Sequence, residues 1–591
     1  MPRSTFAYTN FTAGELSPRL DGRTDLQKYF QGCKTLQNMV IHPHGGATRR
    51  PGTKFIAETK SSGEARLIPF EFSTTQTYVL EFGNTYMRVY KDGGQVLNSG
   101  TVVEISTPYS AAEANELKFT QSADVLFIVH PSHQPRKLSR TSHTSWTLSL
   151  YAPTANPFSS SNNFPSCVTF FEERLVFAGT NNDPQKLFFS KAGDFEDMTT
   201  GTNAGDGMSF TIGSDQVNAI KYLKGLRTLL IGTVGGEFVA TASTSAEPIT
   251  PTNIQIKRQA GYGTSDVDAL LAGNRILFVQ RAGKKVRELV FDFDSDGYIA
   301  PDLTLLAEHI AGSGVGTGFT NWTYQQEPDS IVWVVRSDGV LTGMTYQRGE
   351  NVVAWHRHIL GGAFSSGSAV VESVAAISNS LSTAKGEDSL YMIVKRTING
   401  GTKRYVEVMQ PFDFADNIED AWFLDSALQY SGGATTSLSG LDHLEGQTVS
   451  ILANGSTHPD KVVSSGAITL DRSVTKATVG LKYTSALQTM RIESGSADGS
   501  AQGKVKRIQE ITARFFQTVG AEIGSSSTST DLIPFRDSSM AMDTAVELFT
   551  GDKQIEFNAD YETDGFIYIQ QQQPLPMTIT AMYPQLNTYD G

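Results

Sequence analysis

Several groups of side chains have the types and spacing of chemical sites. The most specific is FDFDSDGYIAPDL, in which Asp292, Asp294 and Asp296 occupy alternate positions. In calcium-binding loops this spacing wraps carboxylate oxygens around the ion, and the twelfth position supplies a bidentate acid. That position is Leu303 here, so the three aspartates are an incomplete calcium candidate. The alternative is a turn that leads into a short helix beginning near Asp302.

Histidines occur in three closely spaced pairs, His42/His44, His130/His133 and His356/His358. Two histidines separated by one residue on a strand share a face of the sheet. A metal site needs at least one more convergent ligand, and no such residue is adjacent to any of the pairs. We therefore interpret the pairs as structural, and we predict no metal site among them and no cofactor.

Paired carboxylates also occur at Glu172 and Glu173, directly before Arg174. They could act as a general acid and base, but an ion pair with the neighbouring arginine is the interpretation we favour. The sequence has no nucleophile elbow, no phosphate-binding Walker loop, no dinucleotide fingerprint and no H-E-x-x-H motif. We predict that the protein is not an enzyme, although glycosidase carboxylates leave no local signature that a sequence could reveal.

The elements that must position these residues are short strands. From residue 78 to residue 409 one pattern recurs seven times: an apolar strand, a turn rich in Gly, Asn, Asp or Pro, and an alternating strand. The first strands begin near residues 78, 125, 175, 229, 276, 331 and 390. Propeller blades repeat at roughly 40–50 residues, and a lone hairpin cannot bury its apolar face. We predict a mainly β fold with a β-propeller-like body built from repeated hairpins; the alternative is an open series of β-sandwiches.

The hairpin spacing ends near residue 411, which suggests further units. We expect an N-terminal docking segment (1–65), the propeller-like body (66–410), a β insertion or tip region (411–500) and a C-terminal β-rich segment (501–591). The last of these could pack back on the N-terminal segment. Ser/Gly-rich stretches at 430–440, 493–503 and 524–530 are expected to be loops.

Charge is unevenly distributed along the chain. Residues 1–60 contain nine Lys/Arg and four Asp/Glu, which gives a net charge of +5. The remaining residues contain 39 Lys/Arg and 57 Asp/Glu, which gives a net charge of −18. Because phosphate contacts need cations or amide donors, the acidic body is not expected to grip nucleic acid. Cys33 and Cys167 cannot form a disulfide framework, so we expect them to be reduced and buried. No apolar run approaches the roughly 18 residues of a membrane span, and the N-terminus has no signal-peptide pattern. We therefore expect folding in the cytoplasm and no membrane insertion.

The first 55 residues contain a specific pattern. It runs F-x-x-G-E-x-S-P-x-L-x-x-R-x-D-x-x-x-Y from Phe11 to Tyr29, and G-G-x-x-R-R-P-G-T-x-F from Gly45 to Phe55. This pattern resembles the N-terminal signature of tail nozzle proteins (tail tubular protein B-like) of short-tailed bacteriophages. The stretches FTQSADVLFIVHP and QPLPMTITAMYP resemble the same family. The resemblance covers nearly the whole chain and is lowest over residues 411–500.

The resemblance implies a structural virion protein that assembles in the host cytoplasm and resides in the tail. Nozzle proteins form a hexameric tube beneath the portal adaptor ring, retain and then conduct double-stranded DNA, and carry tail fibres or spikes. DNA then passes through the lumen without sequence-specific binding, and the basic N-terminal segment could dock on a partner of opposite charge. Candidate interface residues are Phe11, Glu15, Arg19, Arg23, Asp25, Arg49 and Arg50.

Two other functions remain open on the sequence. One is a propeller that binds or depolymerises polysaccharide on the host surface, which would need a carboxylate cluster in a deep central pocket. The other is a different structural tail component, such as a baseplate or fibre-anchoring protein. A phosphate-cradling role for HPHGGATRRPGTKFI (42–56) is not expected, because no strand-to-helix frame surrounds it.

Overall fold

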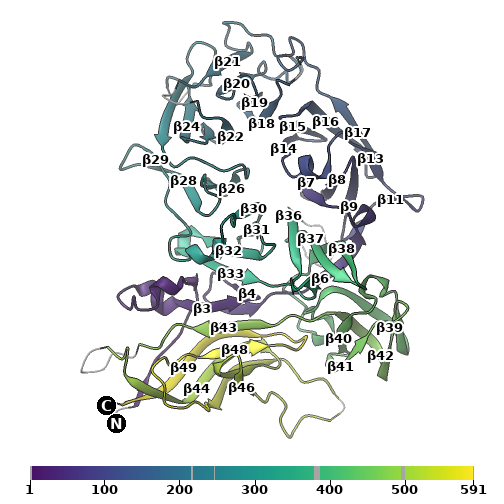
Figure 1. Ribbon diagram of the computed structural model, residues 1–591, viewed down its shortest axis with the longest axis vertical. Coiled ribbons are helices and arrows are strands. Elements are labelled where there is room, and N and C mark those ends of the chain that lie inside the picture. Colours follow the sequence, from purple (N-terminus) through teal and green to yellow (C-terminus); the bar gives the residue numbers. More distant parts are fainter. Residues whose placement is uncertain are drawn as a thin grey trace.

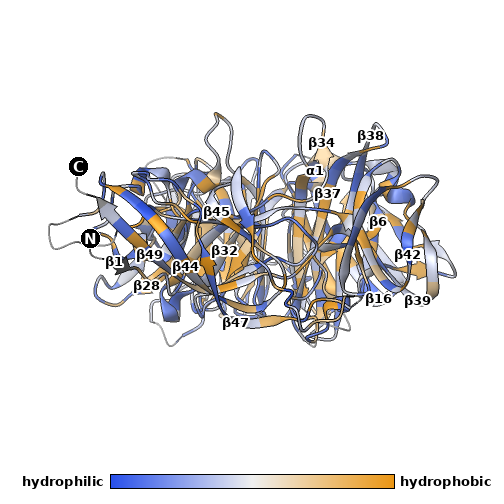
Figure 2. Ribbon diagram, turned by 90° about the horizontal axis from the view of Figure 1, so that it is seen from below, coloured by the Kyte–Doolittle hydropathy of each residue, from blue (hydrophilic) through white to orange (hydrophobic). Residues whose placement is uncertain are grey.

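The computed structural model describes residues 3–160, 162–213, 217–244, 247–378, 386–493, 500–542 and 544–589. Their fold is mainly β and contains a β-propeller, as the hairpin repeat predicted. A ring of sheets occupies the upper part of Figure 1, and two further β units lie below it. The body is shallower than it is wide, and polar and apolar residues alternate along strands such as β44 and β49 (Figure 2).

Each of the first three blades is a sheet of sequential antiparallel strands. Blade 1 contains β7 (Ala65–Ser73), β8 (Gln76–Gly83) and β9 (Tyr86–Lys91), with β10 (Gly94–Gln95) and β13 (Glu104–Ser106) paired to β9. A small hairpin, β11 (Leu97–Asn98) and β12 (Thr101–Val102), projects from it. Blade 2 contains β14 (Lys118–Ser122), β15 (Val125–His130), β16 (His133–Ser142) and β17 (Ser145–Leu150). Blade 3 contains β18 (Pro165–Phe171), β19 (Arg174–Thr180), β20 (Lys186–Phe189) and β21 (Met208–Thr211).

The next three blades repeat this arrangement. Blade 4 contains β22 (Ile220–Gly225), β23 (Leu229–Thr233), β24 (Gly236–Thr241) and β25 (Gln255–Ala260). Blade 5 contains β26 (Leu270–Ala272), β27 (Arg275–Val279), β28 (Val286–Asp292) and β29 (Gly297–Ile299). Blade 6 contains β30 (Phe319–Gln325), β31 (Ile331–Arg336), β32 (Leu341–Gln347) and β33 (Val352–His358). The predicted hairpins are therefore the second and third strands of the blades.

Blade 7 closes the ring with a strand from the other end of the chain. It contains β36 (Val370–Ser378), β37 (Asp388–Ile398) and β38 (Gly401–Met409), and its outer strand is β6 (Thr53–Glu58). The hairpin of β34 (Ala363–Phe364) and β35 (Gly367–Ser368) precedes it. β6 pairs antiparallel with β38, from Met409 opposite Thr53 to Tyr405 opposite Glu58. Because β6 directly precedes blade 1, this pairing ties the last blade to the first.

Apolar clusters between neighbouring blades hold the ring together. Every adjacent pair of blades shares one, and the cluster between blades 7 and 1 includes Leu67, Val79, Tyr391 and Val406. A two-sided apolar sheet cannot be stable alone, so each blade depends on both of its neighbours.

The unit at the bottom of Figure 1, here called the terminal unit, combines both ends of the chain. One of its sheets contains β4 (Met39–Ile41), β5 (Ala47–Arg49), β49 (Thr578–Tyr589), β44 (Val505–Thr518) and β47 (Phe549–Glu556), with β1 (Arg3–Thr5) paired to β49. The other continues from β33 of blade 6 through β2 (Gly14–Glu15), β3 (Gly32–Gln37), β43 (Ser485–Thr489), β48 (Tyr568–Gln571), β45 (Glu522–Ser526) and β46 (Ser529–Leu532).

A second unit, here called the side unit, extends blade 7 beyond β6. Its strands are β39 (Asp425–Ser439), β42 (Ala467–Leu481), β40 (Thr448–Ala453) and β41 (Ser456–Val462). Two expected loops are strands instead. The stretch 430–440 belongs largely to β39, because Ser and Thr fit an exposed strand paired along β42, and 524–530 forms the β45–β46 hairpin. Of the third stretch, residues 494–499 lie outside the described residues.

Helices are few and short. The single described α-helix is α1 (Ala111–Ala114), and the 3-10 turns are η1 (Pro18–Leu20), η2 (Gln27–Gln31), η3 (Lys60–Ser62), η4 (Glu308–Ala311), η5 (Arg348–Glu350), η6 (Ile418–Asp420) and η7 (Asp442–Leu444). None of the described helices has the length and apolar character needed to cross a membrane. Cys33 and Cys167 are free and buried, as predicted.

Candidate functional site

The signature residues of the N-terminal segment meet where the ring joins the terminal unit. Gly14 has φ +66°, and a side-chain carbon there would lie 2.4 Å from the backbone nitrogen of Trp355 in blade 6, so only glycine fits. Beside it, the Glu15 carboxylate is 1% exposed and accepts hydrogen bonds from His309 Nε2 (2.7 Å) and the Leu36 amide (2.8 Å). It also pairs with Arg357 Nε at 2.9 Å.

Arg49 and Arg50 connect the N-terminal segment to the terminal unit and to the side unit. Both are 0% exposed. The Arg50 guanidinium donates to both oxygens of Asp425 in the side unit, at 2.8 and 2.6 Å, and lies 3.8 Å from the ring centre of Tyr483. Arg49 donates to backbone carbonyls of the terminal unit, including that of Leu575 at 3.0 Å.

Four of the seven candidate interface residues are buried within the chain. Phe11 is 1% exposed in the core of the terminal unit, and Glu15, Arg49 and Arg50 are satisfied by partners within the chain. Ion pairs satisfy Glu15 and Arg50, and backbone carbonyls satisfy Arg49. Most of these partners lie hundreds of residues away, which local sequence cannot reveal.

The other three candidates lie on the surface beside η1. The Arg19 side chain is 86% exposed and pairs with Glu308 at 3.3 Å. Arg23 and Asp25 pair with each other at 2.8 Å, and their side chains are 53% and 64% exposed. These three residues remain available to a partner.

Side chains of the innermost strands tie blades together around the axis of the ring. Lys118 of β14 lies 4.0 Å from Cys167 Sγ in β18 and donates to the carbonyl of Lys221 in β22. Gln121 donates to the carbonyl of Glu71 in β7 at 2.8 Å. Seven sheets spaced about 10 Å apart enclose only about 22 Å between backbones before side chains are added. Once side chains fill this space, the axis of a single ring has no room for a DNA duplex.

The aspartate-rich loop is the turn of the β28–β29 hairpin and does not lead into a helix. Asp292 pairs with Gly297 across the hairpin, and its carboxylate accepts the Ser295 amide at 3.0 Å. The carboxylates of Asp294 and Asp296 do not converge with it in the part of the chain that the structure describes. Asp302 is held by Lys285 at 2.8 Å and caps a turn at Thr304, where a helix was expected.

The expected ion pair of Arg174 is not among the described contacts. Glu172 and Glu173 form the tight turn between β18 and β19, with φ +46° and +57°. Glu172 accepts the Ile249 amide at 2.6 Å. Arg174 instead donates to backbone carbonyls, including that of Ser190 at 2.8 Å.

Two of the histidine pairs are structural. His356 Nδ1 lies 2.6 Å from His358 Nε2 inside the sheet of blade 6, and burial lowers the pKa of both rings. His42 pairs with Asp329 at 3.0 Å, whereas His44 is exposed.

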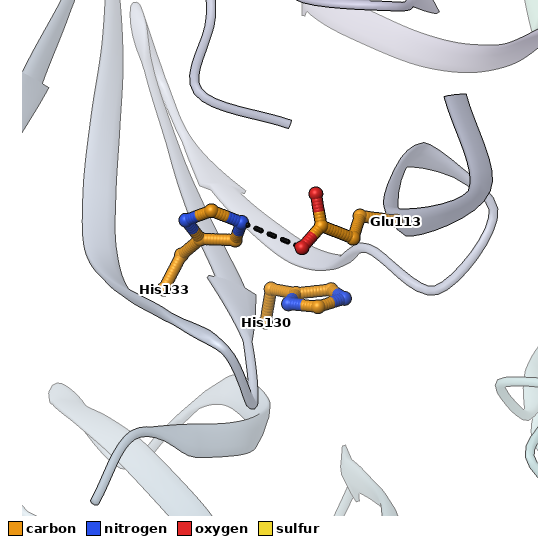
Figure 3. A group of neighbouring side chains, drawn as sticks. All are labelled: Glu113, His130 and His133. Carbon is orange, nitrogen blue, oxygen red and sulfur yellow. Dashed lines mark hydrogen bonds and ion pairs between the residues drawn. The ribbon is translucent and has the colours of Figure 1, made fainter. Parts of the chain in front are cut away.

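The third histidine pair has a partner that the local sequence pattern does not reveal. Glu113, His130 and His133 are the one group of three potential metal ligands in the described segments, with ligand atoms within 4.8 Å of one another (Figure 3). Glu113 lies 17 residues before His130, in α1. Its position three residues after Ser110 marks a helix start, and that was the available signal.

A cleft of about 460 Å³ lies between blade 7 and the side unit. Its lining includes the carboxylates of Glu58, Asp442 and Glu445. Glu58 pairs with Lys403 at 2.9 Å, and Glu445 accepts the amides of Ser465 and Gly466 at 3.0 and 2.8 Å. Two of the three carboxylates therefore already have partners within the chain.

No protein-family model and no curated protein matches the chain. Among solved structures, it is similar to Raptor of Chaetomium thermophilum at 10% identity and a TM-score of 0.37, over 62% of this chain and 29% of that one. It is similar to the Pan2 WD40 domain of Neurospora crassa at 11% identity and a TM-score of 0.35, over 60% of this chain and 91% of that one. It is also similar to the β-propeller domain of Cps50 (Swd1) from Myceliophteria thermophila at 9% identity and a TM-score of 0.34, over 61% of this chain and 100% of that one. Similarity this low carries no argument about function.

Proposed function

We propose that this chain is a structural subunit of the tail nozzle of a short-tailed bacteriophage. In this proposal six copies close into a tube that retains DNA and then conducts it during ejection. The tube docks on the portal adaptor ring and anchors tail fibres or spikes. The subunit catalyses no reaction.

The N-terminal signature is the observation that carries the proposal. Its glycines and charges are the residues that join the ring, the terminal unit and the side unit, at Gly14, Glu15 and Arg50. A sequence pattern that encodes this joint is expected in proteins that share the whole architecture and not only a propeller. The size of the ring supports the need for several copies, because its axis cannot admit a duplex.

The mass of the purified full-length chain under native conditions tests the proposal. We expect a closed ring of six, visible in projection by electron microscopy, or a monomer that forms this ring when the adaptor protein is added. A chain that stays monomeric with the adaptor, or that is a monomer in isolated tails, would contradict the nozzle. Arg19 and Arg23 would then not be docking residues for an adaptor ring.

A second candidate function is the binding or cleavage of host polysaccharide. The cleft between blade 7 and the side unit favours it, because carboxylates line a volume large enough for a small ligand. This cleft lies beside β6, the outer strand of blade 7, and not at the centre of the ring where a pocket was expected. Reducing-end release from host surface polysaccharide measures cleavage, and Asp442→Asn should abolish it. Absence of both cleavage and retention on immobilised polysaccharide would exclude this function.

A further inference from the structure

Glu113, His130 and His133 come together at one end of blade 2. His130 ends β15 and His133 begins β16, and the two residues pair across the tight turn between these strands. Glu113 reaches them from α1, the short helix that connects blade 1 to blade 2. Both rings and the carboxylate lie around the same space in Figure 3, where His133 Nε2 meets Glu113 Oε1 at 3.0 Å.

We propose that these three residues bind a divalent transition-metal ion, with zinc as the ion that best fits the ligand set. Two imidazoles and one carboxylate are ligands that zinc accepts, with water at the remaining position. The ion would fasten the α1 connection to the hairpin of blade 2. This role is independent of the proposed tail function, so either can fail without the other.

The Glu113 carboxylate is fixed in place before any ion arrives. Its Oε2 accepts the Ser110 amide and hydroxyl, both at 2.8 Å, in a capping box at the start of α1. These bonds hold the carboxylate in one orientation. Its Oε1 remains directed at His133, where an ion can replace the hydrogen bond.

His130 has the surroundings of a ligand with a carboxylate behind it. The side chain is 2% exposed, and its Nε2 lies 3.3 Å from Glu116 Oε2 without an aligned hydrogen bond. With the proton on Nε2, the lone pair belongs to Nδ1, which now accepts the Ser132 amide at 3.1 Å. Metal-binding histidines commonly direct the second ring nitrogen to a carboxylate, which orients the ring. Binding would exchange the Ser132 bond for a bond to the ion.

The surrounding charge suits a cation. The carboxylates of Glu113 and Glu116 both lie beside the histidine pair, and Arg136 is the basic residue near the neighbouring Tyr109. The Tyr109 ring meets His133 edge to face at 5.1 Å and limits the rotation of the imidazole. The Tyr109 hydroxyl is buried and has no hydrogen-bond partner among the described residues, so it is a further donor for an ion-bound water.

Zinc titration of the chelator-treated full-length chain tests the proposal. We expect one zinc ion per chain, retained through dialysis, and a cobalt-substituted protein with the absorption of a low-coordinate N,O site. His133→Ala should abolish retention. Glu113→Gln should weaken binding at least tenfold yet keep the capping box, because glutamine also forms this motif. Glu116→Gln should weaken it on the order of 10–100-fold.

His44→Ala is the matched control, since His44 is an exposed histidine far from this site in the sequence. Circular dichroism confirms that each variant is folded. Zinc binding that is equal in wild type, His133→Ala and Glu113→Gln would overturn the proposal, as would a folded wild type that retains no zinc. In either case the three residues form a hydrogen-bonded network only.

Discussion

Arg50 illustrates how single charges hold the three parts of the molecule in register. It comes from the N-terminal segment, and Asp425 comes from the side unit, 375 residues later. Asp425 in turn accepts the amide of Gly361, after blade 6, at 2.7 Å. Because all of these groups are removed from water, loss of one partner leaves an uncompensated buried charge.

Replacing Arg50 with methionine should destabilise the protein by about 3–5 kcal/mol, because the Asp425 carboxylate then stays buried and unpaired. Thermal or denaturant unfolding measures the loss. The double variant Arg50→Met/Asp425→Asn should be more stable than Arg50→Met, since no bare charge remains. Arg23→Ala is the control at an exposed ion pair, and its unfolding should match wild type. Equal losses at Arg50 and Arg23 would refute the role assigned to the buried pair.

Glu237 should make stability depend on pH. Burial between blades raises the pKa of this carboxyl from 4.5 to about 7. The unfolded chain releases this proton at lower pH than the folded one, so the contribution of Glu237 to stability is largest below pH 4.5 and falls as pH rises to 7. The loss is about 3 kcal/mol at most.

Glu237→Gln should remove this part of the pH dependence and raise the melting temperature at pH 8. Glutamine keeps an oxygen for the Tyr262 amide, which donates to Glu237 at 3.3 Å. Glu350→Gln, at an exposed site, is the control. Parallel pH profiles for wild type and Glu237→Gln would show that this carboxyl is already solvated.

Residue roles were the least predictable part of the molecule. His130 and His133 were visible as a pair, but Glu113 was not, because their proximity depends on how α1 packs between blades 1 and 2. Arg49 and Arg50 have the composition of an interface, and only the fold shows that the partners are internal. The aspartate alternation of 292–296 had a simpler cause, a polar hairpin turn.

Elements were far more predictable, because turn chemistry is local. The seven hairpins expected from Gly, Asn, Asp and Pro turns begin within a few residues of β8, β15, β19, β23, β27, β31 and β37. One exception is β6, whose sequence does not indicate that it completes a blade by pairing with β38, more than 340 residues away.

The hydroxyl of Thr53 should contribute to this closure. It donates to Glu407 at 2.6 Å in blade 7 and accepts the Ser426 amide at 2.9 Å at the start of β39. Thr53→Val keeps the shape of the side chain but leaves the Glu407 carboxylate and the Ser426 amide buried with one hydrogen bond fewer each. We expect this to lower the free energy of unfolding by about 1–3 kcal/mol. Faster hydrogen exchange in β6 and β38 measures it. Thr457→Val, on the exposed face of β41, should change nothing, and unchanged exchange in Thr53→Val would exclude the contribution.

At the scale of the whole molecule, net charge governs what the isolated chain can bind. The net charge of the whole chain is −13, and that of the residues after residue 60 is −18. We expect no measurable association with duplex DNA at about 0.15 M salt, where non-specific binders show dissociation constants of about 10⁻⁴–10⁻⁶ M. Fluorescence anisotropy with a labelled duplex tests this. Binding in that range, weakened by salt, would show a basic surface and contradict an inert conduit.

The pairing of β6 with β38 also constrains the order of events during synthesis. Residues 53–58 leave the ribosome before any blade exists, and the strand they must join ends at Met409. At roughly 5–20 residues per second, that interval lasts on the order of tens of seconds. β6 therefore stays without its partner strand for all of this time. β1 and β5 pair with β49, which is synthesised later than β38, so their pairing is delayed further. A nascent chain interrupted before residue 401 would therefore carry exposed strand edges, and we expect such fragments to be captured by chaperones or degraded.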